Sequence, residues 1–198
     1  MATEAQRRIW EKRAELRDEL CGVYKYFTHE TPRANLKSIR ETGLEPRDPG
    51  CSSDDALITE LGVTKRDMVC LHPVGSCGGL HSTQGGPFVL LAIKEVAVPA
   101  EVTLDWSFPG CWGLAAVLGE AETSESQIFL EVVRRRGSVS AIGGISPGNL
   151  YVLCKAAQDG DPEIWCRLEE AHDDDIVVYA TAGQPPSVPQ CPLESPAE

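Results

Sequence analysis

The sequence predicts one α+β domain, with helices in its first third and about six mostly antiparallel strands after them. Three observations lead to this fold class. The chain has 198 residues, 42% of them hydrophobic, which is enough for one compact core. Apolar residues recur at helical spacing in the N-terminal third. Short β-branched and aromatic runs, separated by Gly, Pro and Ser, follow in the rest of the chain.

The N-terminus has the pattern of an amphipathic helix over residues 3–21, and we expect residues 1–22 to pack as a helix on the domain. Thr3 and Gln6 stand at the positions of a capping box. Arg13 interrupts the apolar face, which consists of Ala5, Ile9, Leu16 and Leu20.

A strand is expected over Val23–Phe27, followed by a turn and a second helix. Thr31 is the expected N-cap of this helix, with Pro32 at its first position, and Gly43 is its expected left-handed C-cap. This arrangement places His29 at the beginning of the helix.

The remaining elements follow from the same signals. A short helix is expected over Ser53–Leu61 and another over residues 161–171. We assign residues 23–183 to the domain, and we expect residues 184–198, which contain five prolines, to be disordered. The expected strands are Met68–Pro73, Phe88–Val98, Val102–Trp106, Gln127–Arg134, Leu150–Cys154 and Ile176–Thr181.

The net charge of −12 does not exclude nucleic acid as a partner. From Ala157 onward there is one basic residue against ten acidic ones, whereas residues 1–156 carry 17 basic and 20 acidic residues. The local electrostatic field decides phosphate binding, so the nearly neutral residues 1–156 leave nucleic-acid binding open.

The eight cysteines are too sparse for a disulfide framework and are expected to be mostly free thiols. Without an apolar run or a secretory signal, we expect a soluble protein without a membrane partner, in the cytoplasm, or in the nucleus of a eukaryote.

One stretch carries a recognisable motif. It contains His29, Thr31 and Asn35-Leu36, followed by Ile39 and Gly43-Leu44. With these spacings it resembles the first nucleotide-binding motif of the ADP-ribosyltransferase superfamily, in which a strand ending in His-Gly-Thr/Ser leads into a helix of the form N-L-x-x-I-x-x-x-G-L. Glu30 stands where that family usually has a glycine whose backbone approaches the nicotinamide amide.

The same family ends its catalytic core with a glutamate on a late strand, followed by a Pro-containing return. Glu131 in the expected strand Gln127–Arg134 fits this description, and residues 144–150 supply the return. The resemblance covers residues 23–154 and is nearest to the DarT-like DNA-modifying branch. It implies an α+β fold in which two small, mostly antiparallel sheets form an NAD cleft beside the N-terminal helices.

The resemblance implies an NAD-dependent mono-ADP-ribosyltransferase that uses NAD as co-substrate and no metal. Glu131 would stabilise the oxocarbenium-like ribose that forms when the bond to nicotinamide breaks, as a carboxylate does in glycoside hydrolysis. His29 would bind a ribose hydroxyl, and Thr31 would steady the nicotinamide amide. The implied cofactor-binding residues are His29, Glu30, Thr31, Asn35, Leu44 and, from the middle motif, His72.

The acceptor is expected to be DNA or RNA by resemblance to the DarT-like branch, with a protein side chain as second choice. Arg134, Arg135 and Arg136 follow Glu131 and could dock a phosphate-bearing target. Arginine-directed members of the superfamily carry a second acid two residues before the catalytic one, and Phe129 occupies that position here. The oligomeric state is left open.

Several alternatives remain. Cys70, His72, Cys77 and His81 have the ligand types of a zinc site, although their spacing is not the usual paired one. Cys77 could form a nucleophilic pair with His81 or His29. His29 and His72 could be packed structural residues, while Glu131 and the three arginines could simply face solvent. A non-catalytic nucleotide- or partner-binding module on the same fold is the alternative function.

Overall fold

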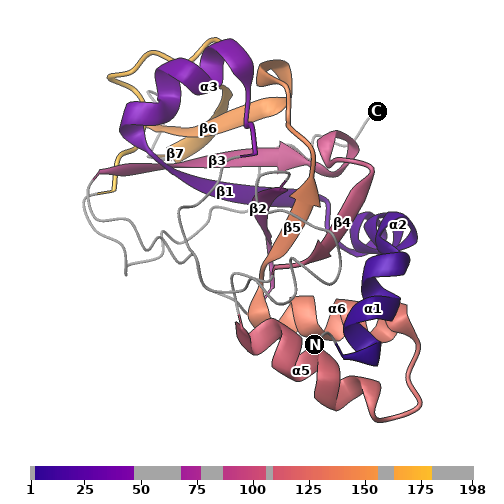
Figure 1. Cartoon of the computed structure of the whole chain (residues 1–198). Helices are drawn as coiled ribbons and strands as arrows, with labels where there is room; N and C mark the ends of the chain where they lie inside the picture. Colours follow the sequence, from indigo (N-terminus) through magenta and orange to yellow (C-terminus); the bar gives the residue numbers. More distant parts are fainter. Residues whose placement is uncertain (1–2, 47–67, 77–86, 106–108, 156–162, 180–198) are drawn as a thin grey trace, which may run out of the picture.

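The computed structural model describes residues 3–46, 68–76, 87–105, 109–155 and 163–179. Within these ranges the chain forms five α-helices and seven strands. All strand pairs of the sheet are antiparallel, in the order β4-β5-β2-β1-β3-β6-β7 (Figure 1). The predicted α+β class with mostly antiparallel strands is confirmed.

The N-terminal helical segment consists of two helices, α1 (Glu4–Glu11) and α2 (Arg13–Val23). The predicted capping box is confirmed, because the Thr3 side chain accepts a hydrogen bond from the backbone of Gln6 while the Gln6 side chain binds the backbone of Thr3. The break falls at Lys12. The Arg13 guanidinium stacks 4.4 Å from the Trp10 ring centroid, and its Nε donates to Glu101 at 2.7 Å, so this charge is accommodated at the break.

Strand β1 (Tyr26–Pro32) begins and ends later than predicted, because pairing with β3 continues through Pro32. The prediction of Thr31 as helix N-cap is therefore wrong. A 3-10 turn, η1 (Arg33–Asn35), precedes α3 (Leu36–Thr42), whose buried residues are Leu36 and Ile39. Gly43 ends this helix with a φ of 84°.

The other strands include two segments that the sequence patterns did not predict as strands, β5 and β7. For β2 the predicted bounds agree with the structure, and β3 ends where the 3-10 turn η3 (Glu95–Ala97) begins. Instead of a last strand over Ile176–Thr181, the described residues show isolated bridges at Ile176 and Tyr179. The strands are β2 (Met68–Pro73), β3 (Phe88–Lys94), β4 (Glu101–Leu104), β5 (Val139–Ile142), β6 (Leu150–Lys155) and β7 (Glu163–Arg167).

Two halves of the sheet meet through a short pairing. Strand β1 pairs with β3 over all of Tyr26–Pro32, whereas its register with β2 joins Phe27 to Pro73 and Thr28 to His72. The halves β4-β5-β2 and β1-β3-β6-β7 are thus connected by two residue pairs. The resemblance implied two small sheets, whereas the seven strands of the described residues form one sheet with a narrow junction.

The prediction of a strand over Gln127–Arg134 is wrong, because this segment lies in α6 (Glu125–Arg136). The Ser124 side chain caps the helix, and Gly137 ends it in the left-handed conformation. The apolar residues recur at helical spacing on one buried face, which consists of Ile128, Phe129, Val132 and Val133.

Two further segments also differ from the expectation. Part of the predicted helix 161–171 is β7, where Trp165 pairs with Leu153 of β6 and completes the sheet edge. Helix α5 (Pro109–Gly119) was not predicted, because it is apolar on all sides and contains glycines. The predicted helix Ser53–Leu61 and the predicted disordered tail 184–198 lie outside the described residues.

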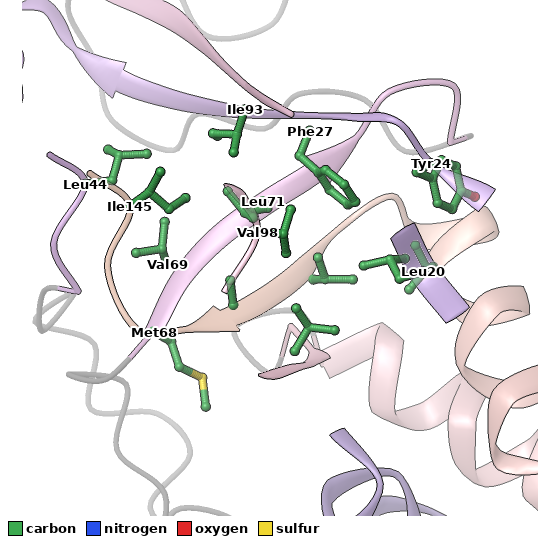
Figure 2. Packing of buried hydrophobic residues seen from close by; sticks show 14 of the residues in the cluster. Leu20, Tyr24, Phe27, Leu44, Met68, Val69, Leu71, Ile93, Val98 and Ile145 are labelled. Carbon is green, nitrogen blue, oxygen red and sulfur yellow. The ribbon is translucent and has the colours of Figure 1, made fainter. Parts of the chain in front are cut away.

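The main core lies between the sheet and the helices. Figure 2 shows Leu20 of α2, Phe27 of β1 and Leu71 of β2 in one cluster of buried side chains, and all three are fully buried. The four buried residues of α6 belong to the same cluster. Helices α1, α2, α5 and α6 gather beside β4 and β5, whereas α3 lies at the other end of the sheet (Figure 1).

Replacement of Gly43 by Ala should lower the free energy of unfolding by about 2–4 kcal/mol, because the backbone has a positive φ and a Cβ would lie 2.0 Å from the carbonyl oxygen of Ile145. Urea titration measures this loss. Gly22→Ala is the matched control. No atom lies within 4 Å of its Cβ position, and alanine favours helix, so stability should stay equal or rise by up to about 1 kcal/mol. Equal stability of the Gly43 variant and the wild type would contradict the close approach to Ile145.

Candidate functional site

One face of the sheet carries polar side chains across four neighbouring strands. The register places Thr103 of β4 opposite Ser140 of β5, Ser140 opposite Cys70 of β2, and His72 opposite Thr28 of β1. Residues two apart on a strand share a face. We define the polar face as Thr103, Asp105, Ser138, Ser140, Cys70, His72, Thr28 and Glu30.

Most of this face is buried. Thr103, Asp105, Ser138 and Ser140 are each no more than 3% exposed, which is unusual for such residue types. On β4, β5 and β2 the alternating positions are apolar and belong to the main core, whereas on β1 the side opposite Glu30 carries Phe27 of the core together with His29 and Thr31. Buried polar groups require hydrogen-bond partners. The hydrogen bonds within the polar face show which of its atoms already have a partner.

Asp105 accepts two hydrogen bonds within the polar face. The Cys70 thiol donates to its Oδ2 at 3.0 Å, and the Ser140 hydroxyl donates to its Oδ1 at 3.5 Å. Burial and the nearby Asp105 carboxylate raise the pKa of Cys70 well above its ordinary value. The thiol therefore stays protonated at neutral pH, which argues against a role as nucleophile.

His72 is held by the segment that follows α6. Its Nδ1 lies 3.1 Å from the carbonyl oxygen of Gly137, and since a carbonyl only accepts, Nδ1 is the protonated nitrogen. Its Nε2 then faces the Cys70 Sγ at 3.9 Å. On the other side, the Thr28 hydroxyl donates to the backbone carbonyl of His72 at 3.2 Å.

His29 lies just beyond the last pair between β1 and β2. Its Nδ1 donates to the carbonyl oxygen of Cys70 at 2.8 Å, which leaves Nε2 as a hydrogen-bond acceptor. Burial, reinforced by nearby His72 and only partly offset by the bond to Cys70, lowers the pKa of His29 to about 4. The imidazole is neutral at physiological pH and can accept a hydrogen bond from a hydroxyl group.

Glu30 is the one residue of the polar face with a carboxylate oxygen that is buried and lacks a hydrogen-bond partner among the described residues. That oxygen is Oε2. Burial raises the pKa of Glu30 to about 7. Glu30 and His29 are consecutive in a regular strand, so their side chains leave β1 on opposite sides.

Thr31, Asn35 and Leu44, which were also predicted to bind the cofactor, contact other parts of the fold. The Asn35 side chain donates to the Thr31 hydroxyl at 3.2 Å, which links the end of β1 to the turn before α3. Leu44 is buried in the main core and forms a bridge with Ile145. The structure thus brings His29, Glu30 and His72 to the junction of β1 and β2, while Leu44 fixes the chain after α3.

The prediction of Glu131 as an acid on a late strand is wrong. Glu131 lies on α6, where its carboxylate accepts hydrogen bonds from Arg134, at 2.9 Å from both Nε and Nη2, and from Arg135. These bonds lower the pKa of Glu131 to about 2. The helix packs beside α1, α2 and α5, away from β1 (Figure 1). Arg136 at the end of the helix lies against Gly110 of α5.

The strand that leads into the Pro147 return is β5, and its sequence Val139-Ser140-Ala141-Ile142 contains no acid. Sequence reasoning did not identify this strand or its serines. The available signal was the alternation of Ser138 and Ser140 with apolar residues. Asp105 was assigned to a strand but not to the site, because its partner Cys70 lies 35 residues earlier in the chain.

The zinc hypothesis receives no support from the described residues, in which no group of three or more His, Cys, Asp or Glu side chains could hold a metal ion. Both the zinc hypothesis and the hypothesis of a nucleophilic Cys–His pair require Cys77 and His81. These two residues lie outside the described residues.

Among the helices of the described ranges, none is long and apolar enough to cross a membrane.

Comparisons of this chain with protein-family models, curated proteins and solved structures find no match.

Glu30→Gln should stabilise the protein at pH 8 by about 1–2 kcal/mol, because it removes a half-buried, partly solvent-screened carboxylate that has one buried, unpartnered oxygen. The pKa of Glu30 in the folded state is about 7, above the ordinary 4.5. Wild-type stability should therefore fall as pH rises from about 4.5 to about 7, and the advantage of the variant should vanish near pH 4.5.

Urea titrations at pH 4.5, 6 and 8 measure this difference. Glu41→Gln, at an exposed position on α3, is the matched control and should show no pH-dependent advantage. A constant difference between Glu30→Gln and the wild type at all three pH values would show that the Glu30 carboxylate is not destabilising in the fold.

Proposed function

We propose that this protein is a nucleotide-binding module that holds a dinucleotide of the NAD type at the junction of β1 and β2. The observation that carries the proposal is the pair of consecutive β1 residues at this junction, whose side chains leave the strand on opposite sides. His29 presents a neutral imidazole with an available acceptor, and Glu30 presents a buried carboxylate oxygen without a partner in the described part of the chain. The resemblance of residues 29–44 to the first nucleotide-binding motif of the ADP-ribosyltransferase superfamily supports NAD as the ligand.

A neutral imidazole suits a ribose better than a phosphate. Its Nε2 accepts from a hydroxyl, whereas a phosphate oxygen would require a donor. The hydrogen bond from Nδ1 to Cys70 fixes the ring, so little side-chain freedom is lost when a ligand binds. Among the nucleotide contacts implied by the resemblance, a ribose hydroxyl on His29 is the one that this geometry favours.

We favour binding over transfer because Glu131, the acid predicted to support catalysis, lies on α6 and not at the junction of β1 and β2. Cleavage of the bond between ribose and nicotinamide needs a carboxylate beside the developing positive charge. Glu131 is paired with two arginines on a helix, and β5 contains no acid. The remaining candidates on the polar face are Glu30 and Asp105, and Asp105 is already engaged by Cys70 and Ser140.

A second candidate function is NAD-dependent mono-ADP-ribosyl transfer with Glu30 as the acid. The unpartnered oxygen of Glu30 is the observation that favours it. The acceptor would be DNA or RNA, or a protein side chain as the other option. The arginines expected to dock it, Arg134, Arg135 and Arg136, are exposed at the end of α6, but the first two already bind Glu131.

Calorimetry with NAD tests the binding proposal, and the release of nicotinamide from NAD, with and without DNA, RNA and protein, tests transfer. Binding without release supports the module, whereas release that Glu30→Gln abolishes supports the transferase. Absence of NAD binding at millimolar concentration would refute both functions.

His29→Ala should weaken NAD binding about threefold to tenfold, the effect of one hydrogen bond of about 0.5–1.5 kcal/mol. Glu131→Gln, which changes a helix-surface ion pair, should leave NAD affinity unchanged and serves as the control. Circular dichroism confirms that both variants are folded. If Glu131→Gln weakened NAD binding and His29→Ala did not, the site would lie on α6 rather than at the β1–β2 junction.

A further inference from the structure

We infer that Cys154 and Cys166 form a redox-active dithiol, which a peroxide closes to a disulfide and a small thiol such as glutathione opens again. The two residues lie on β6 and β7, which pair with each other at the end of the sheet. Strand β3 separates them from β1. The inference therefore concerns a second site and does not depend on the proposed nucleotide binding.

The register of β6 and β7 brings the two thiols together. Cys166 lies directly opposite Val152, and Cys154 lies two positions further along β6, opposite Ile164. Residues two apart on a strand share a face, so Cys154 and Cys166 are diagonal neighbours on one face of the sheet. Their side chains interact, since burial first and then a hydrogen bond with the Cys166 thiol raise the pKa of Cys154.

All five cysteines of the described ranges are free thiols, and two of them besides this pair are close enough to affect each other. These are Cys70 and Cys111, since the nearby Cys111 contributes to the raised pKa of Cys70. The Cys70 thiol, however, is directed to the Asp105 carboxylate at 3.0 Å. Cys154 and Cys166 are thus the pair whose thiols face each other on adjacent strands.

The exposure of the two thiols determines which one reacts first. Cys154 is only 2% exposed, whereas Cys166 is half-buried on the outermost strand of the sheet. Oxidation of a thiol depends on access for the oxidant, so a peroxide reaches Cys166 before Cys154. Cys154 is placed as the second thiol, which resolves the oxidised form of the first.

Closure proceeds in two balanced steps. The Cys166 thiolate attacks one oxygen of hydrogen peroxide, the O–O bond breaks, and the departing hydroxide takes up the proton that the thiol had lost. The Cys154 sulfur then attacks the resulting sulfenic acid of Cys166, the S–O bond breaks, and the second hydroxide leaves as water with the Cys154 proton. Two thiols lose two electrons and two protons, and one peroxide becomes two molecules of water.

The diagonal placement makes this disulfide reversible. Diagonal neighbours on antiparallel strands have Cα atoms about 7–8 Å apart, whereas disulfides favour about 5.5–6 Å. Cys154 is held on both sides, opposite Ile164 and opposite Ile176, so closure has to displace β7. A disulfide that distorts the backbone is reduced more easily than a relaxed one. The pair therefore suits a switch between two redox states better than a permanent cross-link.

Peptide mapping of the full chain by mass spectrometry, before and after treatment with hydrogen peroxide, is the central experiment. We expect one linked peptide pair that joins Cys154 to Cys166, the loss of two of the eight thiols, and no covalent dimer on a non-reducing gel. Millimolar glutathione should then restore all eight thiols.

Variants of the two cysteines test their order of reaction. Cys154→Ala removes the second thiol, so the sulfenic acid of Cys166 should persist and react with dimedone. Cys166→Ser should slow the oxidation of Cys154 at least about tenfold, because burial shields that thiol. Cys21→Ala is the matched control for loss of a buried cysteine. Its thiol donates to a backbone carbonyl on another segment, so the linked pair should still form.

Thermal melting shows whether each variant is folded. If Cys154→Ala does not fold, Cys166→Ser at its half-buried position and the mapping of the wild-type protein still decide the question. A persistent sulfenic acid on Cys166 of the wild type, or a disulfide that joins either residue to any other cysteine, would overturn the inference. A Cys154–Cys166 disulfide that withstands millimolar glutathione would also overturn it, because the bond would then be a structural cross-link.

Discussion

Cys70 connects three strands of the sheet through two different groups, and the geometry of the candidate site depends on these bonds. Its backbone carbonyl accepts from His29 of β1, and its thiol donates to Asp105 at the end of β4. Both bonds are formed where β1 and β2 have stopped pairing with each other. The His29 ring therefore has one orientation, and its second nitrogen is available. The bond to Asp105 also engages the Cys70 thiol, a donor on the same face of the sheet as Glu30.

The polar face shows how a strongly buried sheet can keep functional groups. Cross-strand register alone places hydroxyl, thiol, imidazole and carboxyl groups next to one another on β4, β5, β2 and β1. Asp105 is compensated by two donors, so its burial is tolerated. Glu30 lacks this compensation at one oxygen, as the buried Thr103 hydroxyl does among the described residues, and of these two groups only Glu30 can carry a charge.

The positions of the carboxylates explain why we propose binding before catalysis. A transferase of the proposed kind needs an ionised acid beside the ribose, and the acid expected from the sequence is instead neutralised by arginines on α6. What remains at the junction of β1 and β2 is a neutral histidine and an acid with a pKa of about 7. The neutral histidine can accept a hydrogen bond from a sugar hydroxyl, and Glu30 is left as the acid through which the proposed transfer could occur.

The sequence by itself determined the features that depend on neighbours along the chain. The capping box at Thr3, the bounds of β2 and the end of α3 at Gly43 all follow from local signals. The segment Gln127–Arg134 also carried local helix signals that the strand prediction missed, since Ile128, Phe129, Val132 and Val133 recur at helical spacing between Ser124 and Gly137. What only the tertiary structure decided is where this helix lies. The helix places its buried face against α5 and the rest of the core, and this packing also removes Glu131 from the site. The contacts of Asp105 with Cys70 and of His72 with Gly137 join residues 35 and 65 positions apart. No local pattern encodes such contacts, since they depend on sheet register, and register is decided by how all the strands bury their apolar faces together.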